Sequence, residues 1–425
     1  MITPPAEFLS RMRAVLGAEF SAFEECYSRP AERAIRVNTL KISAQQFAKC
    51  SPFPLEGQVP WCDSGFYISE EKPGLQVEHA AGLYYVQEPS AMCAAPLLDG
   101  ISGKNVLDLC SAPGGKGTQL AAQMGGEGLL FLNEINFSRA KILSQNVERM
   151  GIRNAVVTVA SPEALAKRYA ACFDAVLVDA PCSGEGMFRK EEAALREWSP
   201  ANVEMCARRQ QTILQCADRL LKAGGRLVYS TCTFSEDEDE RAISSFLSEH
   251  SNYALMRQEK LYPHKVRGEG HFAALMCKTD GDEDGLVPAP AQKLKDREKL
   301  YRNFEKQYLS VRFENLYLAG DTLYSLPDGA PLPAMQTLRA GVRLGEFVNG
   351  RFEPSHSLAM CLKKGEAAFF EVDREGAKAY LSGLTMPCDG NGWMVCAYNG
   401  FPLGWVKAAG GTAKNHYPKG LRIVM

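Results

Sequence analysis

The strongest constraint on the fold is a regular alternation of short apolar runs and amphipathic segments between residues 96 and 279. The apolar runs lie at 105–110, 128–134, 155–160, 173–180 and 225–232, and apolar residues recur at helical spacing between them. Strands that alternate with helices form a parallel sheet covered by helices on both faces. The pattern therefore predicts an α/β fold with a doubly wound, Rossmann-like parallel sheet at its core.

The segments on either side of this core differ from it in character. Residues 5–28 have helical spacing and RAIRVNTLKIS reads as a strand leading into a helix, which indicates an N-terminal α/β appendage over 1–95. The segment 280–293 is acidic and rich in Gly and Pro, as linkers are. Short β-like pieces with Gly and Pro turns follow, which predicts a small β-rich module over 294–425.

Composition bears on where the protein works. The chain has no run of about 18 apolar residues, and its first residues have neither the basic lead nor the apolar block of a signal peptide. None of the 14 cysteines forms a CxxC pair. We therefore expect a cytoplasmic protein with reduced thiols, no membrane contact and no metal. The acidic run EDEDE (236–240) is interpreted as a solvated helix start rather than a metal site.

The overall charge of −2 argues mildly against a large nucleic-acid partner, but the end of the chain is different. From residue 391 onward there is no carboxylate side chain, and four cations stand among five aromatic residues: Lys407, Lys414, Lys419, Arg422, Trp393, Tyr398, Phe401, Trp405 and Tyr417. Cations beside stacking surfaces are typical of RNA-binding proteins. A basic edge on a small β domain would have the same composition.

The turn CSAPGGKGTQ follows the first core strand, where doubly wound sheets bind their ligands. Its glycines, Gly114, Gly115 and Gly117, allow a close approach of backbone to ligand and leave amide groups free at a helix start. The turn matches neither the Walker loop nor the GxGxxG motif. Glu134 ends the second strand, where an acidic residue can hold the hydroxyls of a ribose. S-adenosylmethionine, which has a ribose but no pyrophosphate, fits both observations.

Two cysteines lie at the ends of two further core strands. DAPC places Asp179 and Cys182 there, and STC places Cys232 at the end of the last strand. A thiol is needed for methyl transfer only when the acceptor is an unreactive carbon such as cytosine C5, because addition to C6 activates C5. Ser235 and Glu238 are expected to form a capping box for a helix beginning near Cys232, which would favour its thiolate. Two small core cysteines are the competing interpretation.

LDLCSAPGGK, DAPCSGEG and STCT, in this order and spacing, resemble the motifs of the NOL1/NOP2/Sun family of RNA cytosine-5 methyltransferases. VNTLK, YYVQEPSAM, MFRK, LRAGVRLGEF, GFPLGWVK and KNHYPKGLR resemble the branch acting on small-subunit ribosomal RNA, the RsmF type, whose C-terminal RNA-binding region is PUA-like. The resemblance covers nearly the whole chain. It implies an N-terminal RNA-binding appendage (1–95), a methyltransferase domain (96–279), a linker (280–293) and a PUA-like C-terminal RNA-binding region (294–425).

The resemblance also implies roles for individual residues. Cys232 would be the nucleophile, Cys182 would help release the product, and Asp179, with Lys116 beside it, would belong to the catalytic core and bond the polar edge of the cytosine. The residues implied to bind S-adenosylmethionine are Cys110, Ser111, Ala112, Pro113, Gly114, Gly115, Lys116, Glu134, Ser161, Asp179 and Pro181. Ser161 stands where many members of the family have an Asp near the adenine, and its hydroxyl can still make one hydrogen bond there.

The same residues argue against other methyltransferase functions. A DNA cytosine methyltransferase would use the Pro-Cys thiol and would not need STCT, and an amino-group methyltransferase would have an Asn/Asp-Pro-Pro-aromatic stretch in place of DAPCSG. A small-molecule methyltransferase would not explain the basic tail. The expected substrate is a cytidine of small-subunit (16S) ribosomal RNA. A transfer RNA cytidine, or a non-catalytic RNA-binding factor in ribosome assembly, are the alternatives.

Overall fold

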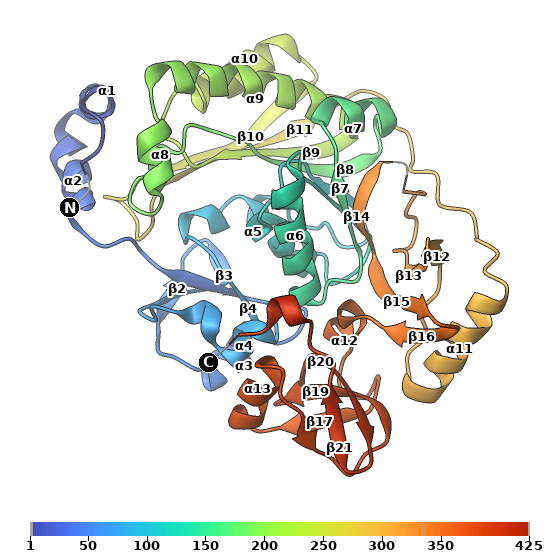
Figure 1. The fold of residues 1–425 in the computed structure, drawn as a ribbon. Helices are drawn as coiled ribbons and strands as arrows, with labels where there is room; N and C mark the ends of the chain where they lie inside the picture. The colour runs from blue at the N-terminus through green and yellow to red at the C-terminus, as the bar shows by residue number, and fades with distance from the viewer. Residues whose placement is uncertain (1–2, 334, 424–425) are drawn as a thin grey trace.

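A computed structural model describes residues 3–333 and 335–423 (Figure 1). Its centre is an eight-stranded sheet in the order β10-β11-β9-β8-β5-β6-β7-β14. The strands are β5 (Asn105–Asp108), β6 (Leu129–Asn133), β7 (Ala155–Val159), β8 (Phe173–Asp179), β9 (Leu221–Thr231), β10 (Tyr253–Leu261), β11 (His271–Lys278) and β14 (Gln336–Ala340). The five strands from β5 to β9 are parallel to one another, which confirms the predicted doubly wound core.

Three antiparallel strands at the edges of the sheet were not predicted. β10 and β11 form an antiparallel pair beside β9, and β14 pairs with β7 at the other edge. β14 comes from the segment after residue 293, which we had expected to form only a separate β-rich module. Its pairing removes an open row of backbone donors and acceptors along β7.

Helices cover both faces of the sheet, as Figure 1 shows. One face packs against α7 (Pro162–Arg168), α9 (Pro200–Leu220) and α10 (Glu240–Glu249), and the other against α5 (Gly115–Gln123) and α6 (Phe137–Met150). The ends of α6 follow local chemistry. Asn136 caps its first turn through backbone amides, and Gly151, with φ of 72°, ends it in a left-handed conformation that glycine adopts without strain.

The N-terminal segment forms two parts. The helices α1 (Ala6–Leu16) and α2 (Phe20–Glu25) pack on the loop after β8, together with α8 (Glu192–Glu197). A four-stranded sheet, β2-β3-β1-β4, lies beside α5 and consists of β1 (Ala34–Val37), β2 (Leu55–Val59), β3 (Cys62–Ile68) and β4 (Tyr84–Val86). Short helices α3 (Ala44–Cys50) and α4 (Val77–Ala80) complete it.

The C-terminal segment contains two sheets rather than one β module. The first, with α11 (Asp296–Tyr308), has β12 (Leu316–Ala319), β13 (Thr322–Ser325), β15 (Val342–Val348) and β16 (Arg351–Pro354). The second, with α12 (His356–Cys361) before it and α13 (Arg374–Leu381) beside it, has β17 (Phe369–Val372), β18 (Met386–Pro387), β19 (Gly392–Tyr398), β20 (Phe401–Ala409) and β21 (Thr412–Asn415). The two sheets share one apolar cluster, in which Trp393 and Trp405 of the second sheet pack with Leu344 of the first. The second sheet also packs against the N-terminal sheet, for example through Val406 and Ile35.

The segment 280–293 has no helix or strand, but it packs against the rest of the protein. Leu286 and Ala289 pack against the main core, and backbone bonds join Asp282 to Ala223 and Asp284 to Ala171. Within the described ranges 3–333 and 335–423, no helix is both long and apolar enough to cross a membrane.

Candidate active site

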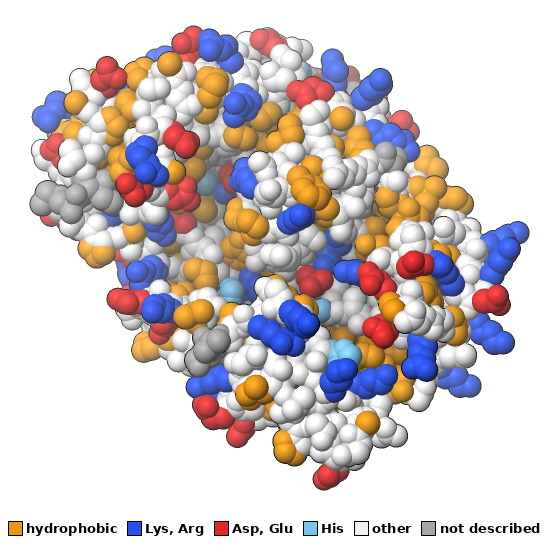
Figure 2. All heavy atoms as spheres, in the orientation of Figure 1, with side chains coloured by type: hydrophobic (Ala, Val, Ile, Leu, Met, Phe, Trp, Pro, Cys, Tyr) orange, Lys and Arg blue, Asp and Glu red, His pale blue; other side chains and the backbone are white. Residues whose placement is uncertain are grey.

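The site lies at the carboxyl ends of the parallel strands, where β5 has β6 on one side and β8 on the other. Two clefts open there, with volumes of about 790 and 800 Å³. Asp179 and Cys232 line both of them, so the clefts meet at these residues. Figure 2 shows the surface hollowed on this side of the molecule. In doubly wound folds ligands bind at this reversal of strand order, as the sequence predicted.

The glycine-rich turn runs from the end of β5 into the start of α5. Gly114 precedes the helix with φ of 113°, a conformation that favours glycine, and leaves the first amides of α5 facing the second cleft. A Cβ added at Gly117 would lie 2.6 Å from the side chains of both Leu132 and Ser111. The turn therefore needs glycine at both positions. Its residues Cys110, Ser111, Ala112, Pro113, Gly115 and Lys116 all line the second cleft.

The turn is held from outside the main sheet by Arg36 of β1. This buried guanidinium donates to the Gly115 carbonyl, to Thr118 Oγ1 at 2.6 Å and to the side chain of Gln87. Burial lowers the pKa of Arg36 to about 10, which leaves it charged at neutral pH. Arg36 lies in the predicted appendage and was not among the predicted site residues. Its contact with the turn joins residues far apart in the chain, and no local sequence pattern predicts it.

The first cleft contains the groups expected around a ribose and an adenine. Glu134 follows β6, is almost fully buried and lines this cleft; it accepts from the Asn136 amide at 2.9 Å and lies 3.3 Å from Arg139. Ile135, which the sequence analysis did not single out, is 64% exposed and lines the same cleft. Ser161 does not line it; its hydroxyl accepts from the Ala164 amide at 3.3 Å and caps α7.

Asp108 supports the same use of this edge. It is fully buried at the end of β5 and lines the second cleft, and neither carboxylate oxygen has a hydrogen-bond partner in the described structure. Burial raises its pKa to about 7. An unpaired buried carboxyl next to free helix amides fits a ligand that is both cationic and anionic, as the methionine part of S-adenosylmethionine is.

The two predicted cysteines meet between the clefts. Cys182 Sγ lies 3.3 Å from Cys232 Sγ, and Gly186 N donates to the Cys232 carbonyl at 2.8 Å. The contact with Cys232, together with burial, raises the pKa of the Cys182 thiol well above its ordinary value. Cys182 therefore keeps its proton at neutral pH. Pro181, also predicted, lines the first cleft beside it.

Asp179 and Lys116 form an ion pair beside the thiols. Lys116 Nζ lies 2.8 Å from Asp179 Oδ1, and Ser230 donates to the same oxygen at 2.9 Å. Partial burial opposes ionisation of Asp179, but the Lys116 ammonium lowers its pKa overall. Lys116 is buried, yet Asp179 raises its pKa. Both groups are therefore charged, and they meet a ligand as a fixed donor and a fixed acceptor.

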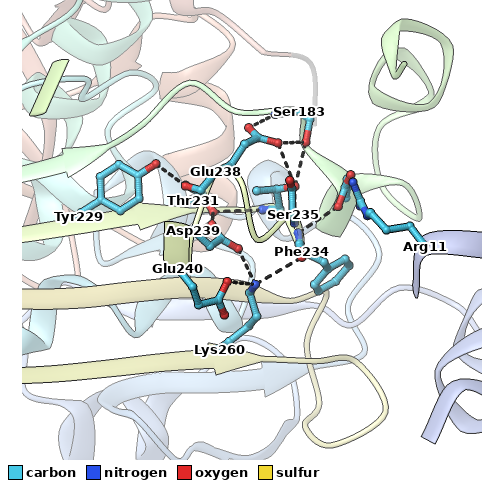
Figure 3. Close-up of polar contacts among 12 residues, drawn as sticks. Arg11, Ser183, Tyr229, Thr231, Phe234, Ser235, Glu238, Asp239, Glu240 and Lys260 are labelled. Atoms are coloured by element: carbon cyan, nitrogen blue, oxygen red, sulfur yellow. Dashed lines mark hydrogen bonds and ion pairs between the residues drawn. The ribbon is translucent and has the colours of Figure 1, made fainter. Parts of the chain in front are cut away.

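A buried polar network joins the loops that bear the two cysteines (Figure 3). Glu238 is fully buried. Its carboxylate accepts from the Ser183 amide at 2.9 Å and from the Ser183 hydroxyl. It also accepts from Gln210 Nε2 at 3.0 Å, and Thr233 Oγ1 lies 2.8 Å from Ser183 Oγ. Ser183 follows Cys182 and Thr233 follows Cys232. The network therefore fixes the two thiols relative to each other.

This network corrects two predictions about the segment after Cys232. α10 begins at Glu240, so Ser235 and Glu238 do not form a capping box, and the Ser235 hydroxyl has no partner among the described residues. The helix start is too far along the chain to act on Cys232 as expected. The run 236–240 is not a solvated face either, because Glu238 and Asp239 are buried, and Asp239 pairs with Lys260 at 2.9 Å.

A second carboxylate ties this region to the N-terminal helices. Glu185 is fully buried, accepts from the Phe234 amide at 3.1 Å and from Trp198 Nε1 at 2.8 Å, and pairs with Arg11 of α1. Phe234 stands two residues after Cys232. Arg11, like Arg36, acts on the site from a part of the chain where no sequence pattern indicated it.

The C-terminal aromatic residues differ from expectation. Trp393, Trp405 and Tyr417 are buried in the cores of the C-terminal modules, because they fill the space around β19 and β20. They are not free stacking surfaces. Tyr398 and Phe401 stay partly exposed. Figure 2 shows Lys and Arg side chains over this end of the molecule, on the same side as the hollow. In the part of the chain that the structure describes, no cluster of three or more His, Cys, Asp and Glu could hold a metal.

Comparison with family models matches the chain in four consecutive stretches. Residues 95–286 match the model described as 16S rRNA methyltransferase RsmB/F. Residues 5–89 match the N-terminal domain of 16S rRNA methyltransferase RsmF, 303–362 the RsmF rRNA methyltransferase first C-terminal domain, and 367–423 the methyltransferase RsmF PUA domain.

Individual relatives of the chain have the same description as these family models. The ribosomal RNA small subunit methyltransferase F of Enterobacter sp. (strain 638) is 34% identical over 98% of this chain and 95% of its own length, and that of Aeromonas salmonicida is 33% identical over 98% and 97%. A methyltransferase homolog from Pyrococcus horikoshii has a TM-score of 0.56 at 29% identity, over 62% of this chain and 91% of that one. NSun6 from the same organism, solved with SFG, has a TM-score of 0.59 at 19% identity, over 65% and 99%, and shows the fold alone.

Proposed function

This chain belongs to the RsmB/F family of 16S ribosomal RNA methyltransferases, in its RsmF branch, and from this membership we propose that it methylates C5 of a cytidine through a covalent bond from Cys232. The observation that carries the proposal is the pair of thiols 3.3 Å apart at the junction of the two clefts. A methyltransferase acting on nitrogen or oxygen has no use for a nucleophilic thiol, because those atoms bring their own lone pair.

The cofactor is S-adenosylmethionine, which supplies an electrophilic methyl group when bound. We propose that the turn from Cys110 to Lys116 holds its methionine part and that Glu134 holds its ribose. Asp179 and Pro181 would border it where the clefts meet. Ile135 gives the adenine an apolar surface, and Ser161, which does not line the cleft, has no contact in this assignment. The unpaired Asp108 and the free amides of α5 support this assignment.

The chain's own residues then account for the addition step. The Cys232 thiolate would attack C6 of the cytosine, and the electrons of the C5–C6 double bond would move onto C5 and the ring. Asp179 and Lys116, a fixed acceptor and a fixed donor 2.8 Å apart, would bind the polar edge of the base, and the Lys116 ammonium would stabilise that negative charge. C5 can then bond a methyl carbon.

Release of the product needs two proton transfers, one from C5 and one to the departing Cys232 sulfur. The proton on C5 must leave, the C5–C6 double bond must form again, and the C6–Sγ bond must break. We propose that Cys182 donates its proton to the departing Cys232 sulfur and is reprotonated by the proton lost from C5. Its raised pKa, which keeps it protonated beside Cys232, supports this role over that of nucleophile.

Substitution of each cysteine tests the mechanism. Incubated with S-adenosylmethionine and ribosomal RNA from a strain lacking the gene, Cys182→Ala is expected to accumulate a denaturation-resistant protein–RNA adduct. Cys232→Ala is expected to give neither adduct nor product. Cys50→Ala, which changes an exposed thiol away from both clefts, serves as the control with wild-type behaviour. An adduct formed by Cys232→Ala would reverse the two roles.

Bisulfite mapping of RNA from cells with and without the gene tests the substrate. Loss of methylation at a 16S cytidine in the deletion is the expected result. Loss at a transfer RNA cytidine would instead identify transfer RNA as the substrate. Unchanged methylation everywhere would favour a non-catalytic assembly factor. We also propose a cytoplasmic location and a division of labour over 1–95, 96–279, 280–293 and 294–425. RNA binding would fall to the first and last of these segments.

A further inference from the structure

His271 lines the second cleft near Asp179, and neither the sequence motifs nor the mechanism above uses it. It is the first residue of β11, whose next residue, Phe272, pairs with Thr231 of β9. His271 therefore stands level with Cys232 on the neighbouring strand. It lines the second cleft together with Lys116, Asp179 and Cys232.

The imidazole is buried without a hydrogen-bond partner. The residue is 1% exposed, and neither Nδ1 nor Nε2 is bonded to any group in the described structure. Asp179 Oδ1 lies 3.9 Å from Nε2, which is too far for a hydrogen bond. That oxygen already accepts from Lys116 and Ser230. A buried polar group left unpaired costs stability, so its position needs a reason other than packing.

The backbone around His271 is held firmly in place. Gly270 N donates to Ser90 Oγ at 3.0 Å, and Glu269 N donates to Glu88 Oε1 at 2.8 Å. A Cβ added at Gly186 would lie 2.9 Å from the Cys232 carbonyl oxygen and 3.0 Å from that of Gly270. The strand that carries the imidazole and the loop that carries the nucleophile are thus packed as one unit, which is what a preorganised site requires.

The charge state of the ring limits what it can bind. Burial and the nearby Lys116 lower the pKa of His271 to about 3, although Asp179 opposes them, so the ring is neutral. A neutral imidazole offers one donor and one acceptor. So weak a base does not suit removal of the C5 proton. The polar edge of a cytosine, with an amine donor next to nitrogen and oxygen acceptors, is the complementary partner.

We propose that His271 is a substrate-recognition residue, which hydrogen-bonds the polar edge of the cytosine inserted beside Cys232. It completes a set in which Asp179 accepts, Lys116 donates and the imidazole supplies the third contact. This inference rests on the proposed function, because it needs a base in the second cleft. It assigns His271 to the RNA, because the imidazole stands level with Cys232, and not to the methionine part of the cofactor, whose proposed turn lines the same cleft.

The test compares His271→Phe, which keeps a ring of similar size without hydrogen-bonding atoms, with His271→Gln, which restores a donor and an acceptor. The substrate is ribosomal RNA from a strain lacking the gene, and the affinity for S-adenosylmethionine is measured separately. For His271→Phe we expect kcat/KM for RNA to fall by roughly 10- to 100-fold with unchanged cofactor affinity. His271→Gln should recover part of that loss. His250→Phe makes the same change outside both clefts and should behave as wild type.

Each outcome separates this inference from the proposed function. If wild type forms 5-methylcytosine and an adduct but His271→Phe matches it in kcat/KM, only the inference fails. A fall in cofactor affinity equal to the fall in kcat/KM would assign His271 to the cofactor or to the fold, and would also overturn the inference. If wild type itself forms neither 5-methylcytosine nor an adduct, the proposed function fails and the inference fails with it.

Discussion

Replacing Arg36 by Met is predicted to weaken cofactor binding while leaving the fold intact. Arg36 is 1% exposed, and no carboxylate pairs with it among the residues that the structure describes. Its partners are neutral: the Gln87 side chain, the Gly115 carbonyl and Thr118 Oγ1. A buried charge without a counter-charge costs several kcal/mol to desolvate, which offsets much of what its hydrogen bonds contribute. The methionine side chain has a similar length and no such cost.

The magnitudes follow from these contacts. The three hydrogen bonds to the charged group contribute about 1.5 to 3 kcal/mol each, or roughly 5 to 9 kcal/mol together. The desolvation cost of several kcal/mol is of the same order, so the unfolding midpoint should move by less than about 3 °C. The turn, however, loses the hydrogen bonds that join it to Arg36 of β1. If the loss of these contacts weakens the binding free energy of S-adenosylmethionine by the equivalent of one such bond, about 1.5 kcal/mol, its Kd rises roughly tenfold.

Calorimetric titration with S-adenosylmethionine and thermal unfolding without it measure the two effects on the same samples. Arg29→Met, which removes an exposed cation paired only with Glu25, is the control and should change neither quantity. An unchanged Kd in a folded Arg36→Met protein would refute the reasoning. A large drop in the unfolding midpoint would show instead that the charge stabilises the fold.

Three further predictions concern the buried groups of the site. Glu238→Ala leaves two buried N–H donors unpaired and should cost about 2 to 4 kcal/mol in denaturant unfolding, whereas the exposed Asp237→Ala should cost less than about 0.5; equal effects would contradict the network. Asp108 has its pKa raised by burial from 3.8 to about 7, so its stabilising contribution is complete below pH 3.8 and is lost as the pH rises towards 7. Asp108→Asn should therefore flatten the decline in unfolding temperature between about pH 4 and 7, and an unchanged decline would place the titration elsewhere. Diamide should join Cys182 and Cys232 in an intramolecular disulfide that abolishes activity until a thiol reductant is added; two free thiols after treatment would contradict their 3.3 Å separation.

The sequence predicted the site residues that lie at the ends of the parallel strands. Cys182, Cys232, Asp179 and the glycine turn each end a parallel strand, and parallel strands in one sheet end at one edge. That geometry is enough to bring residues together that lie more than 100 positions apart. The turn glycines could be predicted for the same reason, since a strand-to-helix turn that meets a ligand needs them.

Residues that act from other elements could not be predicted in this way. His271 begins an antiparallel strand whose place beside β9 follows from a pairing between distant segments, with no motif to mark it. Glu238 lies in an acidic run that looks like a solvated helix start. Whether such a carboxylate faces water or a buried loop depends on where α10 begins, and helix boundaries are the least determined feature of a sequence pattern.

The N-terminal contacts suggest why the catalytic sheet is joined to an appendage at all. Arg36 of β1 holds the cofactor turn, and Arg11 of α1 binds Glu185, which in turn accepts from the Phe234 amide after Cys232. One cation therefore reaches each half of the site, the cofactor side and the nucleophile side. RNA that binds the appendage would bind a part already in contact with both. Separating residues 1–95 from the sheet should then impair cofactor binding as well as RNA binding. A sheet that bound S-adenosylmethionine at full affinity without them would show that the appendage only recruits RNA.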